Sequence, residues 1–156
     1  MMKKLLTLLG FVTALLMPGV AISEGTVLSV RAEGSVHDYT LAQLRALGEV
    51  KVQTTTIWTE GEQHFVGVPL RSLMAGLGIH SGTVTASAVN DYAVVIPLAD
   101  ASATAPIIAY ERNGATMSLR EKGPLWVIYP YDSDPAYRTE ETYSRSIWQL
   151  NRLAAE

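Results

Sequence analysis

The first 23 residues have the pattern of a secretory signal peptide. Two lysines precede an apolar run from Leu5 to Leu16, and a Pro-Gly pair and small residues follow it. The apolar run is about twelve residues long, whereas a membrane-spanning helix needs roughly twenty, so cleavage is favoured over retention as an anchor. We therefore expect residues 1–23 to be removed and residues 24–156 to work in the periplasm, with no membrane insertion afterwards.

The remaining length and composition limit the fold. Cleavage after Ser23, with Ala21 as the alternative, leaves 133 of the 156 residues, which is enough for one domain but too few for two. Without Lys3 and Lys4 the chain has ten basic and 15 acidic residues, a balance of −5 that argues against nucleic acid as a partner. The absence of cysteine excludes disulfides, thiolate catalysis and a lipid anchor, so stability must come from packing.

The patterning predicts many strands and a few short helices. Leucines at helical spacing predict helices over Leu41–Leu47, after the N-cap Thr40, and over Leu70–Leu77, after Pro69. Alternating, β-branched or continuous apolar segments predict strands at 25–34, 50–59, 64–70, 83–90, 92–98, 105–119 (a hairpin turning at Asn113-Gly114) and 125–131. A polar stretch, 132–146, and a final amphipathic segment, 147–154, follow. We therefore expect a single compact α+β domain with mixed β-sheets and two or three short helices.

No familiar catalytic or metal-binding motif is present. His37, His64 and His80 are scattered, and none has a ligand partner at helical spacing, so no metal site is expected. Nucleotide-binding loops and nucleophile elbows are absent.

Two stretches place polar groups beside aromatic ones at strand ends, where pockets of sheet proteins form. The first is "NDY", Asn90 to Tyr92, and the second is "YSRSIW", Tyr143 to Trp148. Each also has a simpler interpretation, the first as an ordinary turn and the second as a C-terminal strand with one solvated face.

Several separated segments resemble one protein family in the same order. "FVGVPLRSLM", "NDYAVVIPLADA", "IIAYERNGATMSLREKGPLWVIYP" and "SRSIWQLNRL", over roughly residues 34 to 153, resemble the molybdopterin-binding domain of sulfite-oxidase-type oxidoreductases. The resemblance implies a compact α+β domain that holds a pterin between strand ends and loops.

One departure from that family changes the expected chemistry. Its enzymes ligate molybdenum through a cysteine in the segment that aligns with "TIWTE", where this chain has Trp58 and Thr59. The resemblance therefore implies a pterin ligand without molybdenum and no catalysis. The Trp58 indole would fill the volume of the metal centre or stack on the pterin.

A pterin ring presents an edge of two N–H donors, which the Asp91 carboxylate could accept together. Asn90, Ser144, Arg145 and Ser146 could address the remaining polar atoms. The resemblance thus implies a site for a neopterin-like or tetrahydropterin ligand formed by Trp58, Thr59, Asn90, Asp91, Tyr92, Tyr143, Ser144, Arg145, Ser146 and Trp148.

Cysteine-free chains of this kind resemble periplasmic pterin-binding proteins that work with a membrane signalling enzyme, either a cyclic di-GMP cyclase or phosphodiesterase or a sensor kinase. We expect the segment "YPYDSDPAYRTEETY", with its tyrosines and carboxylates, to face the periplasmic domain of that partner, and its simpler interpretation is a plain connecting loop. Two alternatives stay open: a molybdopterin-dependent oxidoreductase subunit, and an interaction scaffold that has lost its ligand.

Overall fold

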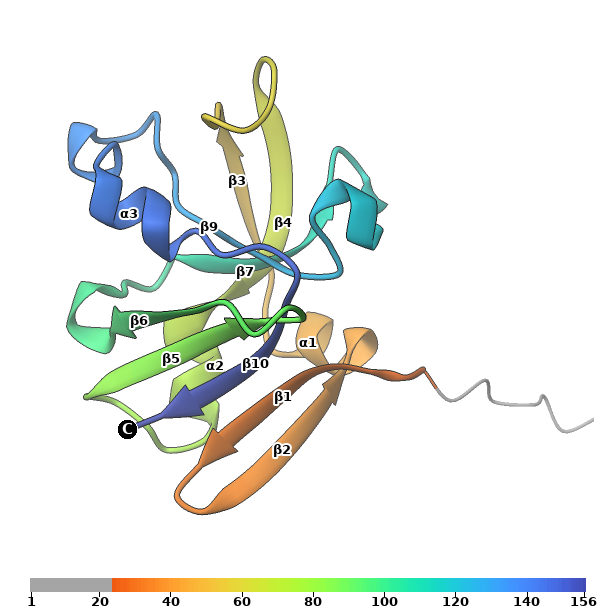
Figure 1. Cartoon of the computed structure of the whole chain (residues 1–156), viewed down its shortest axis with the longest axis vertical. Helices are drawn as coiled ribbons and strands as arrows, with labels where there is room; N and C mark the ends of the chain where they lie inside the picture. The colour runs from red at the N-terminus through yellow and green to blue at the C-terminus, as the bar shows by residue number, and fades with distance from the viewer. Residues whose placement is uncertain (1–23) are drawn as a thin grey trace, which may run out of the picture.

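The computed structural model describes residues 24–156, so the predicted signal peptide lies outside the described residues. Within them the chain forms two five-stranded sheets, with helices between and beside them (Figure 1). No helix in this described part is long and apolar enough to cross a membrane.

The first sheet has the strand order β2-β1-β10-β5-β6. Its strands are β1 (Thr26–Ala32), β2 (Ser35–Thr40), β5 (Thr83–Ala88), β6 (Ala93–Pro97) and β10 (Leu150–Ala155). The last strand, β10, runs parallel to β1 and antiparallel to β5. The C-terminal strand therefore joins the two hairpins β1-β2 and β5-β6 into one sheet.

The second sheet has the order β3-β4-β7-β8, and β9 pairs with β7. Its strands are β3 (Val50–Thr54), β4 (Gln63–Pro69), β7 (Ile107–Arg112), β8 (Ala115–Thr116) and β9 (Trp126–Ile128). The β7-β8 turn uses Asn113 and Gly114 at φ angles of 53° and 84°, a left-handed pair that Asn-Gly adopts readily.

Three short α-helices and three 3₁₀ turns connect the described strands. They are α1 (Leu41–Ala46), α2 (Leu70–Gly76), α3 (Glu140–Arg145), η1 (Leu98–Asp100), η2 (Leu119–Glu121) and η3 (Pro135–Tyr137). A capping box starts α1, because the Thr40 hydroxyl accepts from the Gln43 amide while the Gln43 side chain accepts from Thr40 N–H.

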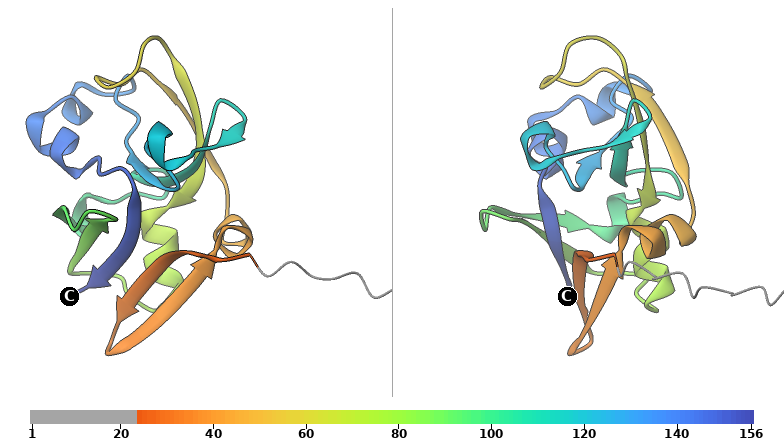
Figure 2. Two further views of the ribbon diagram at one scale, coloured as in Figure 1. Left: turned by 45° about the vertical axis from the view of Figure 1, so that its right-hand side comes forward. Right: turned by 90° about the vertical axis from the view of Figure 1, so that its right-hand side faces the viewer.

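The hydrophobic core lies between the two sheets. Helices α1 and α2 lie on the side of the first sheet that faces the second, as the turned views show (Figure 2). They bury Leu44, Leu73 and Met74, each with no exposed surface. The core extends to Phe65 and Trp126 in the second sheet, whose rings meet edge to face at 5.5 Å.

The α+β architecture with mixed sheets and short helices is as predicted, and both expected helices form within one residue of the expected bounds. Three local elements differ. Strand β3 ends at Thr54 instead of residue 59. Strand β2 forms where no element was predicted, and the polar stretch after β9 contains α3. The side chain of Thr139 caps α3 by accepting from the Thr142 amide at 3.2 Å, and Glu140 and Glu141 occupy its first turn.

Candidate functional site

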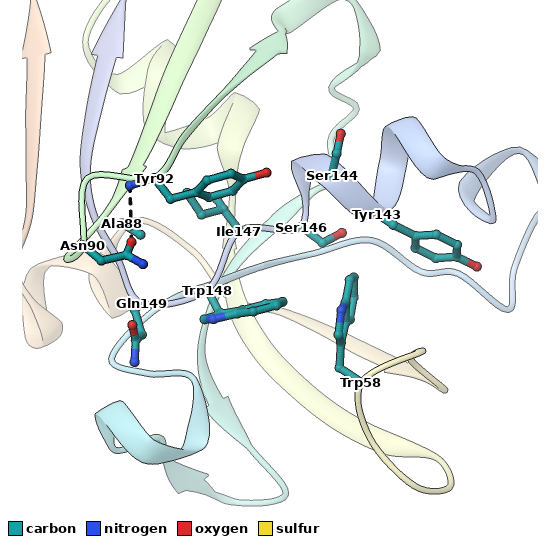
Figure 3. Close-up of a pocket in the computed structure, with 10 residues that line it drawn as sticks. All are labelled: Trp58, Ala88, Asn90, Tyr92, Tyr143, Ser144, Ser146, Ile147, Trp148 and Gln149. Carbon is teal, nitrogen blue, oxygen red and sulfur yellow. Dashed lines mark hydrogen bonds between the residues drawn. The ribbon is translucent and has the colours of Figure 1, made fainter.

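A cavity of about 310 Å³ opens where the β3-β4 loop, the β5-β6 turn and the segment from α3 to β10 meet (Figure 3). This volume is at the lower end of the range of small-molecule pockets, roughly 300–1,000 Å³. The residues that line the cavity are Trp58, Ala88, Asn90, Tyr92, Tyr143, Ser144, Ser146, Ile147, Trp148 and Gln149. Four of them are aromatic and none is charged.

The β3-β4 loop brings Trp58 to the cavity because β3 ends early. The Asp132 carboxylate accepts from the Thr55 amide at 2.6 Å and from the Thr55 hydroxyl at 2.8 Å, and Asp132 N–H donates to the Thr54 hydroxyl. These bonds draw the chain out of the sheet, and the hydrogen bonds from Thr55 hold the pKa of Asp132 below its usual value. The Thr56 hydroxyl then accepts from the Trp58 amide and closes a tight turn.

The Trp58 indole is surrounded by rings. It meets Trp148 at 5.7 Å, Trp126 and Tyr143 at 5.8 Å, and Tyr131 at 6.2 Å between ring centroids, each in an edge-to-face arrangement. Figure 3 shows Trp58 upright beside the ring of Trp148, with Tyr143 on its other side. Each such pair contributes about 0.5–1.5 kcal/mol beyond area burial, so this wall is fixed before any ligand arrives.

The Ser146 hydroxyl is largely committed to the protein. It donates to the Thr142 carbonyl at 2.8 Å, which leaves the Tyr131 hydroxyl to donate to it at 2.6 Å. Burial raises the pKa of Tyr131 to about 12, so this phenol stays a donor at physiological pH. The Trp126 indole N–H donates to the Ser146 carbonyl at 3.1 Å, and Ser146 can offer a ligand only its remaining acceptor capacity.

The β5-β6 turn supplies the polar lip of the cavity. The Asn90 side-chain carbonyl accepts from the Tyr92 amide at 3.3 Å, and this orients the NH₂ group of Asn90 as a donor (Figure 3). The turn is closed by Tyr92 O, which accepts from the Ala88 amide at 2.8 Å. Asp91 lies at the tip with a left-handed φ of 67°, which Asp tolerates better than most residues.

The structure brings seven of the ten sequence-predicted residues to the cavity and places Thr59, Asp91 and Arg145 outside its lining. The Asp91 carboxylate pairs with Arg152 of β10 at 2.6 Å. Arg145 is only 15% exposed and pairs with Asp100 at 3.0 Å and with Glu141 at 2.5 Å. Thr59 bonds through its hydroxyl to Thr56. The ligand-binding role of all ten residues stays a prediction.

Sequence reasoning missed Ala88, Ile147 and Gln149 as lining residues. Ala88 and Ile147 carry no polar signal, and Gln149 reaches the cavity because it adopts a left-handed φ of 51° after Trp148. The only sequence signal for Gln149 is that it directly follows the "YSRSIW" stretch.

Residues 28–132, about two thirds of the chain, match the oxidoreductase molybdopterin binding domain. The chain belongs to this family. No curated protein matches it. The match ends at Asp132, so Trp58, Asn90 and Tyr92 of this molybdopterin-binding domain lie inside the matched region, and the cavity residues 143–149 lie beyond it.

The donor set of the cavity does not fit the metal of a molybdopterin cofactor. The chain has no cysteine, the lining contains no His, Asp or Glu, and the described residues hold no group of three such side chains that could bind a metal. The lining also lacks the Arg or Lys that would grip a phosphate. Flat aromatic faces and neutral hydrogen-bonding groups fit the pterin ring itself.

Proposed function

We propose that this chain is a periplasmic binding protein that holds a pterin without molybdenum and presents its ligand state to the periplasmic domain of a membrane signalling enzyme. One observation carries the ligand part of the proposal. A cavity in a molybdopterin-binding domain is walled by four aromatic side chains and edged by amide and hydroxyl groups, and the chain has no cysteine that could ligate molybdenum.

The recognition of a pterin follows from these groups. The pterin ring system is flat, so it can stack on, or pack edge to face against, the rings of Trp148, Trp58 and Tyr143. Its polar edge carries both donors and acceptors. The Asn90 NH₂ group can donate to the acceptors, and the Gln149 side-chain carbonyl and the Ser144 hydroxyl oxygen, whose hydrogen donates to the Glu141 carbonyl, can accept from the donors. Neopterin and tetrahydropterins are the ligands that we expect, because a neutral side chain suits a lining without charge.

The partner surface rests on the segment "YPYDSDPAYRTEETY", residues 129–143, whose last residue, Tyr143, lines the cavity. Its carboxylates Asp132, Asp134, Glu140 and Glu141 are exposed, in keeping with a basic partner surface. The expectation that Tyr129 and Tyr131 offer contact area to the partner is wrong, since they are 4% and 2% exposed and pack in the core. Tyr137 of this segment stays partly exposed.

Titration calorimetry with neopterin, on protein from which bound ligand has been removed, tests the proposal. We expect saturable binding to the wild type and to Ile57→Ala, because Ile57 is 60% exposed on the same loop and does not line the cavity. Trp58→Ala should bind about tenfold to a hundredfold more weakly. Wild-type protein that does not bind any pterin, yet still binds the partner domain, would leave the interaction scaffold as the function.

The signalling part needs its own measurement. Affinity for the partner's periplasmic domain is compared with and without saturating neopterin, at two salt concentrations, because coupling requires the ligand to favour the partner-competent state. A change in affinity on adding ligand is the expected result. Equal affinity in all conditions would reduce the protein to a pterin carrier.

A further inference from the structure

The cavity wall formed by Trp148 has a second face, and a lysine covers it. The Lys122 ammonium lies 4.2 Å from the Trp148 ring centroid and 5.8 Å from that of Trp126. Lys122 is not among the cavity-lining residues. In Figure 3 the cyan turn that precedes it, η2, lies on the other side of the Trp148 ring from Tyr92 and Ser146.

The backbone holds Lys122 in this place from two directions. Lys122 ends η2 in a left-handed conformation with a φ of 74°, and its N–H donates to the Leu119 carbonyl. Its carbonyl accepts from the Gln149 amide at 3.0 Å, and the Gln149 side chain donates to the Leu119 carbonyl at 2.9 Å. Because Gln149 directly follows Trp148, the lysine and the indole are tied to the same stretch of chain.

A cavity lined by indole and phenol rings would ordinarily attract a cation. The faces of these rings are electronegative, and cages of this kind bind quaternary ammonium groups. Here the ammonium of Lys122 already occupies one face of Trp148. A second cation on the cavity face would stand opposite a like charge one ring away, with no lining carboxylate to offset the repulsion. The carboxylate of Asp91, at the tip of the turn, is engaged by Arg152.

We propose that Lys122 is a positioning residue that acts through Trp148 and sets the charge preference of the cavity, favouring neutral or anionic flat rings over cationic ligands. This inference rests on the proposed pterin function, since it deepens the choice of ligand at the same site.

Three probes test it by calorimetry: neopterin, which is uncharged, pterin-6-carboxylate, which is anionic, and choline, which is cationic. The wild type should bind pterin-6-carboxylate at least as tightly as neopterin and should not bind choline. Lys122→Met keeps the aliphatic stem and removes the charge, so the affinity ratio of pterin-6-carboxylate to neopterin should fall about two- to fivefold, and choline binding should appear. Lys122→Arg should restore the wild-type ratio.

The control is Arg120→Met, which removes an equal charge from the same turn but no cation–π contact of the described residues. It should leave the ratio unchanged. Choline binding to the wild type would overturn the inference, and this arm needs no variant. The inference would also be overturned if Lys122→Met bound both pterins more weakly by the same factor, or if Arg120→Met changed the affinity ratio as much as Lys122→Met does. Wild-type protein that does not bind neopterin would instead contradict the proposed function.

Discussion

The two walls of the cavity are held in different ways. The aromatic wall of Trp58, Tyr143 and Trp148 is packed ring against ring, with Trp58 alone meeting four neighbours within 6.2 Å. The polar lip depends on single hydrogen bonds, such as the 3.3 Å contact that orients Asn90. Packing therefore fixes the shape of the site, and a few adaptable polar groups are left to select the ligand.

The largest effect is expected on the aromatic wall. Trp58→Ala removes a stacking face and opens a gap against four rings, so neopterin affinity should fall about tenfold to a hundredfold. The same change should lower the free energy of unfolding, by up to about 3 kcal/mol because the indole is only partly buried. Calorimetry and urea unfolding measure the two effects, and a variant with unchanged affinity would place the ligand elsewhere.

A smaller effect is expected at the polar lip. Asn90→Ala removes one neutral hydrogen-bonding group, which contributes about 0.5–1.5 kcal/mol, so neopterin affinity should fall between about twofold and twelvefold. Stability should hardly change, because Asn90 is exposed at a turn. If Asn90→Ala weakened binding more than Trp58→Ala, the division of roles between the two walls would be reversed.

Removal of the Tyr131 hydroxyl, which lies behind the aromatic wall, should lower stability without changing neopterin affinity. Tyr131→Phe removes the donor to Ser146, at a cost of about 1 kcal/mol of unfolding free energy. Burial raises the pKa of Tyr131 in the folded protein to about 12, above the ordinary tyrosine value of about 10. Its contribution to stability is therefore full below about pH 10 and is lost as the pH rises toward 12.

Burial also raises the pKa values of Tyr39, Tyr110 and Tyr129, so the wild type should lose stability steeply in this alkaline range. Denaturant midpoints recorded at several pH values should show a shallower decline for Tyr131→Phe. An identical slope in the two proteins would contradict the burial of this phenol.

The smallest effect is expected at Asp91. Its carboxylate is 84% exposed and pairs with Arg152 outside the cavity lining, and exposed pairs contribute about 0–1 kcal/mol. Asp91→Asn should therefore change neopterin affinity less than about fivefold. A loss of a hundredfold would show that Asp91 leaves Arg152 and accepts the two N–H donors of the pterin, as the sequence resemblance suggests.

The sequence was informative where local patterns decide the structure. The leucine spacing of α1 and α2, and the Asn113-Gly114 turn, follow from helical periodicity and from backbone preference. The early end of β3 could not be predicted, because Asp132 breaks the strand pairing from 77 residues away. The β-branched run at 50–59 by itself predicts a continuous strand and carries no information about the Asp132 carboxylate.

The candidate site shows the same limit. The two short aromatic-polar stretches located six of the predicted lining residues, since their side chains carry the chemistry of a pocket, and the family resemblance added Trp58. Sequence could not show that Arg145 is held by Asp100 or that Asp91 is held by Arg152, because both partners lie far along the chain. The contact of Lys122 with Trp148 could not be predicted for the same reason, because the two residues lie 26 positions apart in the chain.

The most direct test of the account is to purify the full chain from the periplasm of cells supplied with molybdate, and to measure both its metal content and its released small molecules. Elemental analysis should find far less than one molybdenum atom per chain, and mass spectrometry of the denatured sample should find a pterin without a phosphate. One molybdenum per chain, released with a phosphorylated pterin, would contradict the account and assign the protein to molybdopterin-dependent redox chemistry.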